Sequence, residues 1–180
     1  MDFAIGENTI QDFIDHILKS IENNEVRSKL IEFVKKTQEL EIFYHMNENS
    51  SSPRFSIILG NNDKGEPLIF QYFIKKDKLQ GHYCLYISIP RGHPFHGKIY
   101  YAIPDAIYSQ PDEDDSSRWV FGWKYSHYNI LTTNAIFLFH NSCPQTLLEM
   151  QIISYDIIEA DVNRYSAFLV ASNPIHPIAE

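Results

Sequence analysis

The amino-acid sequence predicts an α+β fold: an N-terminal helical hairpin, an antiparallel sheet of about five strands, and a long C-terminal helix packed on that sheet. Three observations lead to this prediction. Apolar residues recur at helical spacing up to residue 44, β-branched and aromatic runs divided by turn residues follow from residue 54, and helical spacing returns after Pro144. At 180 residues the chain is long enough to bury a substantial core.

Two amphipathic helices are expected before residue 47. Between residues 10 and 21, Ile, Phe and Leu recur at spacings of three and four, so they share one stripe of a helix. Thr9, followed three residues later by Asp12, resembles a helix start. A second apolar stripe runs from residue 25 to 44. The two helices would form a hairpin that serves as a scaffold.

A polar connector at 47–53 marks the one internal boundary that the composition indicates. It divides the chain into an N-terminal helical hairpin, residues 1–49, and an α+β ligand-binding core, residues 54–180. No internal repeat and no low-complexity segment is visible in either part.

Turn residues divide the second part into strands. Strands are expected at 54–59, 67–75, 82–89 and 118–126, with an irregular or edge strand within 99–109, which contains Pro104. Gly122 weakens its strand unless another group packs close to its backbone. Residues 133–139 fit either a short strand or a covered apolar segment. From residue 144 to about 170, helical spacing predicts one long helix with Pro144 in its first turn.

Charge and cysteine content restrict the function. The net charge of −8 and the pI near 5.4 exclude a broad basic surface of the kind that binds DNA. A small anion stays compatible with this charge, because its site needs only two or three local cations. The carboxylate run from Asp112 to Asp115 is expected in a solvated surface loop. Two cysteines cannot form a thiolate-rich zinc site and are expected as reduced thiols.

The expected location is the cytoplasm. The N-terminal residues lack the basic region and the long apolar stretch of a signal peptide. No apolar run reaches the length of a membrane-spanning helix, so contact with a membrane is not expected. No cofactor is expected either, and a homo-oligomer is one of the assembly states that the sequence leaves open.

Residues suited to ligand chemistry concentrate between Gly81 and Tyr128. This stretch holds four of the eight histidines and both tryptophans. An anion or nucleotide site would combine cations, aromatic faces for stacking and hydrogen-bonding imidazoles. The expected ligand-binding residues are Arg91, His93, Lys98, Arg118, Trp119, Trp123, Lys124, His127 and Tyr128.

Three other functions stay open. A metal site would use His93 and His96 together with His127, but Pro94 and the adjacent glycines argue against a helix face for the first two, and no metal is predicted. A small hydrolase or phosphodiesterase would use His93 and His127 as acid–base groups. A protein–protein inhibitor would use the helical hairpin and the acidic loop as contact surfaces.

A series of short motifs lies in the same stretch: Gly-His-Pro-x-x-Gly-Lys at 92–98, Tyr-Ser at 108–109, Trp-x-x-Gly-Trp at 119–123, and His127. This series resembles a family of small uncharacterised proteins found in phages, prophages and bacteria. The match covers roughly residues 83–127 and leaves the N-terminal helices unmatched. Where the family tends to have Asp after the Gly-aromatic pair this chain has Lys124, and where it often has Tyr before Gly-Lys this chain has His96.

The resemblance implies a role in phage–host conflict. The predicted function is therefore a binding protein that captures a small phosphorylated or nucleotide-like ligand, as a phage-encoded antagonist of host defence signalling in the host cytoplasm. Lys124 favours capture of an anion over carboxylate- or metal-dependent chemistry.

Overall fold

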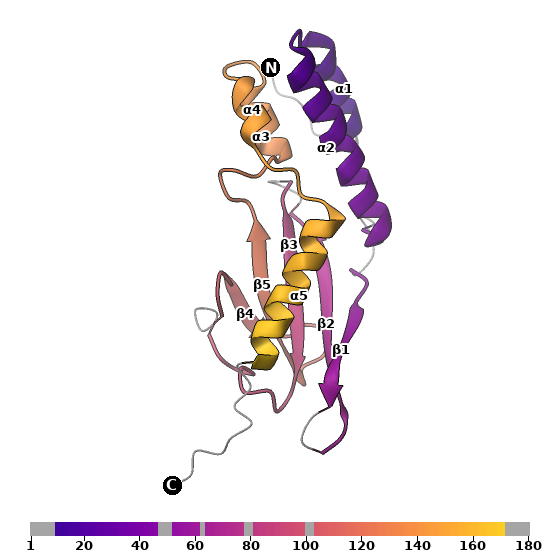
Figure 1. Cartoon of the computed structure of the whole chain (residues 1–180), viewed down its shortest axis with the longest axis vertical. Helices are drawn as coiled ribbons and strands as arrows, with labels where there is room; N and C mark the ends of the chain where they lie inside the picture. Colours follow the sequence, from indigo (N-terminus) through magenta and orange to yellow (C-terminus); the bar gives the residue numbers. More distant parts are fainter. Residues whose placement is uncertain (1–9, 47–51, 62–63, 78–80, 100–102, 172–180) are drawn as a thin grey trace.

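The computed structural model describes residues 10–46, 52–61, 64–77, 81–99 and 103–171. Its helices are α1 (Ile10–Ser20), α2 (Asn24–Phe43), α3 (Thr133–Phe139), α4 (Gln145–Glu149) and α5 (Tyr155–Ala171). Its strands are β1 (Phe55–Asn61), β2 (Pro67–Lys76), β3 (Tyr83–Pro90), β4 (Tyr108–Pro111) and β5 (Arg118–Tyr125). Figure 1 shows α1 to α4 gathered at one end and the sheet, crossed by α5, at the other. The predicted α+β fold is confirmed.

One apolar cluster holds the helical end together. Buried in it are Ile14 and Ile17 of α1, Ile21 directly after α1, and Val26, Leu30 and Phe33 of α2. The same cluster takes in Leu131, Ala135, Ile136, Leu147 and Met150 from the α3 and α4 region. The predicted hairpin therefore packs on two later helices. The boundary predicted near residue 49 stays a prediction, because residues 47–51 lie outside the described residues.

The segment 133–139, expected as a short strand or a covered apolar segment, is helix α3. Thr132 caps its N-terminus, because its Oγ1 accepts a hydrogen bond from the Ala135 amide at 3.1 Å. The cap satisfies an amide that has no partner inside the helix, and it ends the extended backbone that precedes α3.

The helix expected across 144–170 is divided into α4 and α5 by an extended stretch that begins at Met150. Here the Gln151 amide donates to the Asn129 carbonyl at 2.7 Å, and the Gln151 carbonyl accepts from the Leu131 amide at 2.8 Å. Both peptide groups are thus paired with a distant segment, which leaves them unable to continue a helix. None of the described helices is long and apolar enough to cross a membrane.

The five strands form one antiparallel sheet in the order β1-β2-β3-β5-β4 (Figure 1). Strands β1 to β3 form an antiparallel meander, and β5 lies between β3 and the short edge strand β4. Gly122 of β5 pairs with Tyr86 of β3 and with Tyr108 of β4. A Cβ at Gly122 would lie 2.9 Å from side-chain carbons of both tyrosines. The strand glycine thus has the close neighbour that its position was expected to require.

Helix α5 covers one face of the sheet, which we call the α5 face (Figure 1). Trp123 stacks on Tyr165 of α5 with ring centroids 4.2 Å apart. The Tyr125 hydroxyl donates to Asp161 of the same helix at 2.9 Å. Alternate residues of each strand point to the other side of the sheet, which we call the opposite face.

Candidate functional site

Strand alternation separates the predicted cations of β5 from its tryptophans. Because successive side chains of a strand point to opposite sides, Trp119 and Trp123 lie on the α5 face with the core. Arg118 and Lys124 lie on the opposite face. The stacking rings and two of the cations expected in one pocket are therefore on two sides of the sheet.

Trp123 belongs to the hydrophobic core. Its side chain is 3% exposed, its ring packs flat on Tyr165, and its Nε1 donates to the Pro104 carbonyl at 2.9 Å. A nucleobase could stack on this ring only if α5 were displaced. The structure therefore gives Trp123 a role in joining the sheet to α5.

His93 uses both ring nitrogens to fix the chain after β3. Nδ1 accepts a hydrogen bond from the Phe95 amide at 3.1 Å. Nε2 must then carry the proton, and it donates to the Leu169 carbonyl at the end of α5, also at 3.1 Å. Burial lowers the pKa of His93, which is 6% exposed. The neutral ring thus links the β3 end of the sheet to α5, and neither of its nitrogens is free for proton transfer or for a metal.

His127 and Tyr128 lie at the other end of the sheet from His93. His93 follows the end of β3 that pairs with Arg118, whereas His127 follows the far end of β5. A strand of eight residues spans about 23 Å between its ends. Both residues are exposed, and Tyr128 is 93% exposed. His93 and His127 do not converge.

The segment from Pro90 to Lys98, which we call the β3 loop, lies at the end of the sheet where β3 finishes. Its backbone closes successive tight turns, and Gly92 and Gly97 take φ angles of +93° and +79° there. No described atom lies within 4 Å of the position that a Cβ would occupy at either glycine. Arg91 and Lys98 are exposed, and neither forms an ion pair with another described residue.

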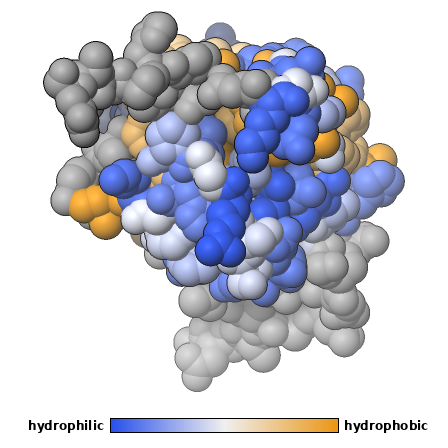
Figure 2. All heavy atoms as spheres, turned by 90° about the horizontal axis from the view of Figure 1, so that it is seen from below, coloured by the Kyte–Doolittle hydropathy of each residue, from blue (hydrophilic) through white to orange (hydrophobic). Residues whose placement is uncertain are grey.

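His96, which belongs to the same loop as these two cations, lies against Trp119. The His96 ring centroid is 5.5 Å from that of Trp119. His96 Nε2 is buried and has no hydrogen-bond partner in the described part of the chain. Trp119 Nε1 donates to Ser109 Oγ at 2.8 Å, and the Ser109 hydroxyl in turn donates to the Lys98 carbonyl. The surface seen from this end of the molecule is largely hydrophilic (Figure 2).

Arg118, a predicted ligand cation, is engaged on the opposite face of the sheet. Its Nε donates to Ser88 Oγ at 2.9 Å, and its Nη2 donates to the carbonyls of Ser88 and Ile69 at 2.8 and 3.1 Å. These bonds join β5 to β3 and β2. Most of the donors of Arg118 are therefore used inside the protein.

Asp112 forms a buried hydrogen-bond network that was not predicted from the sequence. It was expected in a solvated run, but it is 3% exposed, so that expectation is wrong for this residue. It accepts two hydrogen bonds from Arg54, at 2.6 and 2.7 Å, and others from Ser88 and the Asp114 amide at 2.7 and 3.0 Å. Burial opposes ionisation, yet the bonds from Arg54 and Ser88 outweigh it and lower the pKa of Asp112. Every lone pair of this carboxylate is occupied, which indicates a structural anchor.

No metal centre is found among the described residues. No group of three or more His, Cys, Asp or Glu side chains within the ranges given above is arranged to hold an ion. Cys84 and Cys143 are free thiols, and burial raises the pKa of Cys84. The three imidazoles that the metal alternative required are split between the two ends of the sheet.

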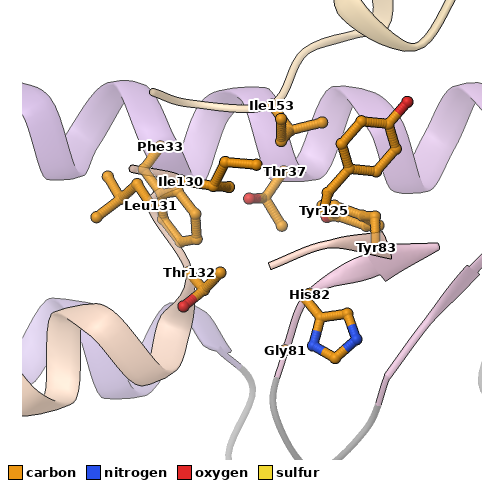
Figure 3. Close-up of a pocket in the computed structure, with 10 residues that line it drawn as sticks. All are labelled: Phe33, Thr37, Gly81, His82, Tyr83, Tyr125, Ile130, Leu131, Thr132 and Ile153. Atoms are coloured by element: carbon orange, nitrogen blue, oxygen red, sulfur yellow. The ribbon is translucent and has the colours of Figure 1, made fainter. Parts of the chain in front are cut away.

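The enclosed cavity in Figure 3 is too small for a nucleotide. It measures about 10 Å³ and lies between α2, the start of β3, the end of β5 and the segment that precedes α3. Such a space holds one water molecule. An open hollow of about 430 Å³ lies at the helical end, lined by α2 residues and Leu148. Neither is formed by the predicted ligand-binding residues.

The comparisons with known proteins add no relative. No protein-family model matches the chain, and no match is found among curated proteins or among solved structures. The function therefore has to be argued from the site itself.

Proposed function

We propose that the protein is a binding protein that holds a small phosphorylated or nucleotide-like ligand at the β3 loop. One observation carries the proposal: two exposed cations without ion-pair partners among the described residues, Arg91 and Lys98, lie on the same short loop as His96, whose buried Nε2 has no partner there either. An anionic group at the loop surface would accept hydrogen bonds from the two cations, because phosphate oxygens accept from guanidinium and ammonium alike. It would reach the buried Nε2 of His96 only after the side chains that cover this atom shift.

The rigidity of the β3 loop supports this proposal. The tight turns hold its backbone, and His93 ties it to the last turn of α5. A preorganised loop loses little conformational entropy when a ligand binds. The open space beside Gly92 and Gly97 lets a ligand approach the backbone closely.

The proposed site is smaller than the set of residues expected from the sequence. Arg91, Lys98 and Trp119 remain, and His96 joins them. Arg118 stays outside because its donors are used, and Trp123 stays outside because α5 covers it. A base could contact the Trp119–His96 pair, while the phosphate is held at the protein surface.

Two alternatives have different support. A hydrolase that uses His93 and His127 is the weaker proposal, since His93 has no free nitrogen and the two rings are separated by the length of β5. A protein–protein inhibitor is favoured by exposed apolar side chains at the helical end, Ile31, Phe137 and Leu138, which are 53%, 59% and 56% exposed. The role in phage–host conflict rests on the sequence resemblance.

The test is calorimetric titration with a panel of nucleotides and with inorganic phosphate. The double variant Arg91→Ala/Lys98→Ala removes the two cations, and Lys19→Ala/Lys35→Ala is the matched control, because it removes the same kind of charge from exposed positions of α1 and α2. We expect Kd to rise by about tenfold or more in the first double variant only. Absence of binding to every compound, or equal weakening in both double variants, refutes the proposal. Recovery of hydrolysed nucleotide supports the hydrolase instead.

A further inference from the structure

We propose that the protein forms a homodimer in which β1 of one copy pairs antiparallel with β1 of a second copy about a two-fold axis. The two five-stranded sheets would then join into one continuous sheet. This inference does not depend on the ligand proposed for the β3 loop.

The first support is the position of β1 in the sheet. It is the terminal strand, and no described strand pairs with its outer side (Figure 1). An outer edge presents a row of backbone donors and acceptors that another β-strand can match. The chemistry of this edge therefore specifies what covers it: a strand in the plane of the sheet.

The second support is that β1 lacks most of the features that protect edge strands. Phe55–Asn61 contains no charged residue and no proline, and only a register shift towards its end interrupts the pairing with β2. The other edge differs, because β4 has four residues, ends at Pro111 and continues into the acidic run. Prolines and charges at an edge prevent pairing between copies. The β4 edge is thus protected against pairing with another strand, whereas the β1 edge is open to it.

The third support is the apolar surface around β1. Ile58 is 71% exposed and pairs across the strands with Ile69, which is 37% exposed. On the other side, the Phe43 ring lies 6.4 Å from Phe55 and 4.3 Å from Tyr155, and both Phe43 and Tyr155 are exposed. Exposed apolar groups therefore flank the open edge on both faces, as is typical of an interface.

The pattern of β1 favours a second copy as the partner. Phe55, Ile57 and Leu59 alternate with Ser56 and Ile58. Consider an antiparallel pair of β1 strands related by a two-fold axis, in which each face of the sheet continues into the second copy. Phe55, Ile57 and Leu59 then lie on the same face as the same three residues of the partner copy, and Ser56 and Ile58 share the other face in the same way. Each chain carries a net charge of −8, so two copies repel each other over most of their surface, whereas the uncharged edge lets them approach.

Light scattering coupled to gel filtration tests the proposal across a concentration series. The chain has a mass of 21.0 kDa, so a dimer has twice that mass. We expect a dimer for the wild type, and monomers for Ile58→Lys and for Ser56→Lys, which place a charge at exposed positions of β1. Ile31→Lys is the control, because Ile31 is 53% exposed on α2 away from this edge, and it should stay dimeric.

Three outcomes overturn the proposal. The wild type could be a monomer at every concentration, which would leave the edge for a strand of another protein. Both β1 variants could stay dimeric, which would move the interface elsewhere. Ile31→Lys could dissociate the dimer as strongly as Ile58→Lys, which would remove the assignment to β1. Circular dichroism of the two β1 variants checks that each is folded, and either one is sufficient for the test.

Discussion

The bond between Arg54 and Asp112 offers the sharpest test of the structure, because the same arginine also binds an exposed carboxylate. Arg54 donates to Asp112 at 2.6 and 2.7 Å and to Asp114 at 2.8 Å. The Asp112 side chain is fully buried and that of Asp114 is 66% exposed. Asp112→Asn and Asp114→Asn therefore make the same chemical change in two environments.

The expected losses of unfolding free energy differ severalfold. Asp112→Asn leaves a mostly buried guanidinium facing an amide, and breaking one side of a buried pair costs about 3 kcal/mol at the lower end of the usual range. The lower end applies because the Arg54 side chain keeps 21% exposure. Asp114→Asn removes a solvent-screened pair and should cost about 0.5 kcal/mol. Urea unfolding measures both, with equal m-values showing that the comparison is valid.

The pH dependence of the unfolding free energy gives a second test of the Arg54–Asp112 pair. The pKa of Asp112 is lowered in the folded protein, so its contribution is present above the unfolded pKa of about 3.9 and is lost as pH falls through the folded pKa. The difference between the wild type and Asp112→Asn should therefore shrink in acid. Equal losses in the two variants at neutral pH, or a loss below 1 kcal/mol for Asp112→Asn, would refute the argument that this carboxylate anchors the loop.

Three further changes test the core and the β3 loop. Gly122→Ala places a methyl 2.9 Å from Tyr86 and Tyr108, and urea unfolding should show a loss of about 1–3 kcal/mol; an unchanged midpoint would contradict the close packing. Trp123→Ala removes a buried ring and should cost about 3–5 kcal/mol by the same assay, whereas a loss below 1 kcal/mol would indicate an exposed platform. The pKa of His93 is lowered, so stability should fall as pH drops below about 6.5, by up to about 1.4 kcal/mol per pH unit. His93→Asn should make the unfolding free energy less dependent on pH in this range. An unchanged pH dependence would contradict the assignment of His93 as a buried neutral imidazole.

The sequence predicted the sheet and the hairpin because each has a local periodic signal. The apolar stripes of α1 and α2 and the alternation of β3 can be recognised without knowledge of any distant contact. Residues 135–139 are all apolar, so a helix and a covered strand give the same pattern there. The cap at Thr132, which the prediction from sequence did not use, is the local feature that distinguishes the helix.

The break before α5 could not be predicted in this way. Met150, Ile152 and Ile153 continue the apolar pattern of a helix across it. What ends α4 is the pairing of Gln151 with the segment at 129–131, which is set by tertiary packing. Such a pairing cannot be predicted from the local helix propensity of these residues.

The candidate site was predicted less well than the fold because its residues were grouped by their place in the chain. Trp123 and Lys124 are neighbours in sequence, and for that reason they lie on different faces of the sheet. Arg54 and Asp112 are 58 positions apart, yet they form a two-point contact. Applying alternation to 118–124 would have separated the cations from the rings, but no sequence rule would have paired Arg54 with Asp112.

The same geometry is the reason for proposing the ligand at the β3 loop and not on a face of the sheet. A strand residue is restricted to one face. Helix α5 packs on one face, and on the opposite face Arg118, Ser88 and Asp112 are hydrogen-bonded to one another. A loop with two glycines at positive φ can turn its side chains and its backbone toward one point. Within it the two histidines differ: both ring nitrogens of His93 form hydrogen bonds that hold the loop, whereas the buried Nε2 of His96 has no hydrogen-bond partner among the described residues.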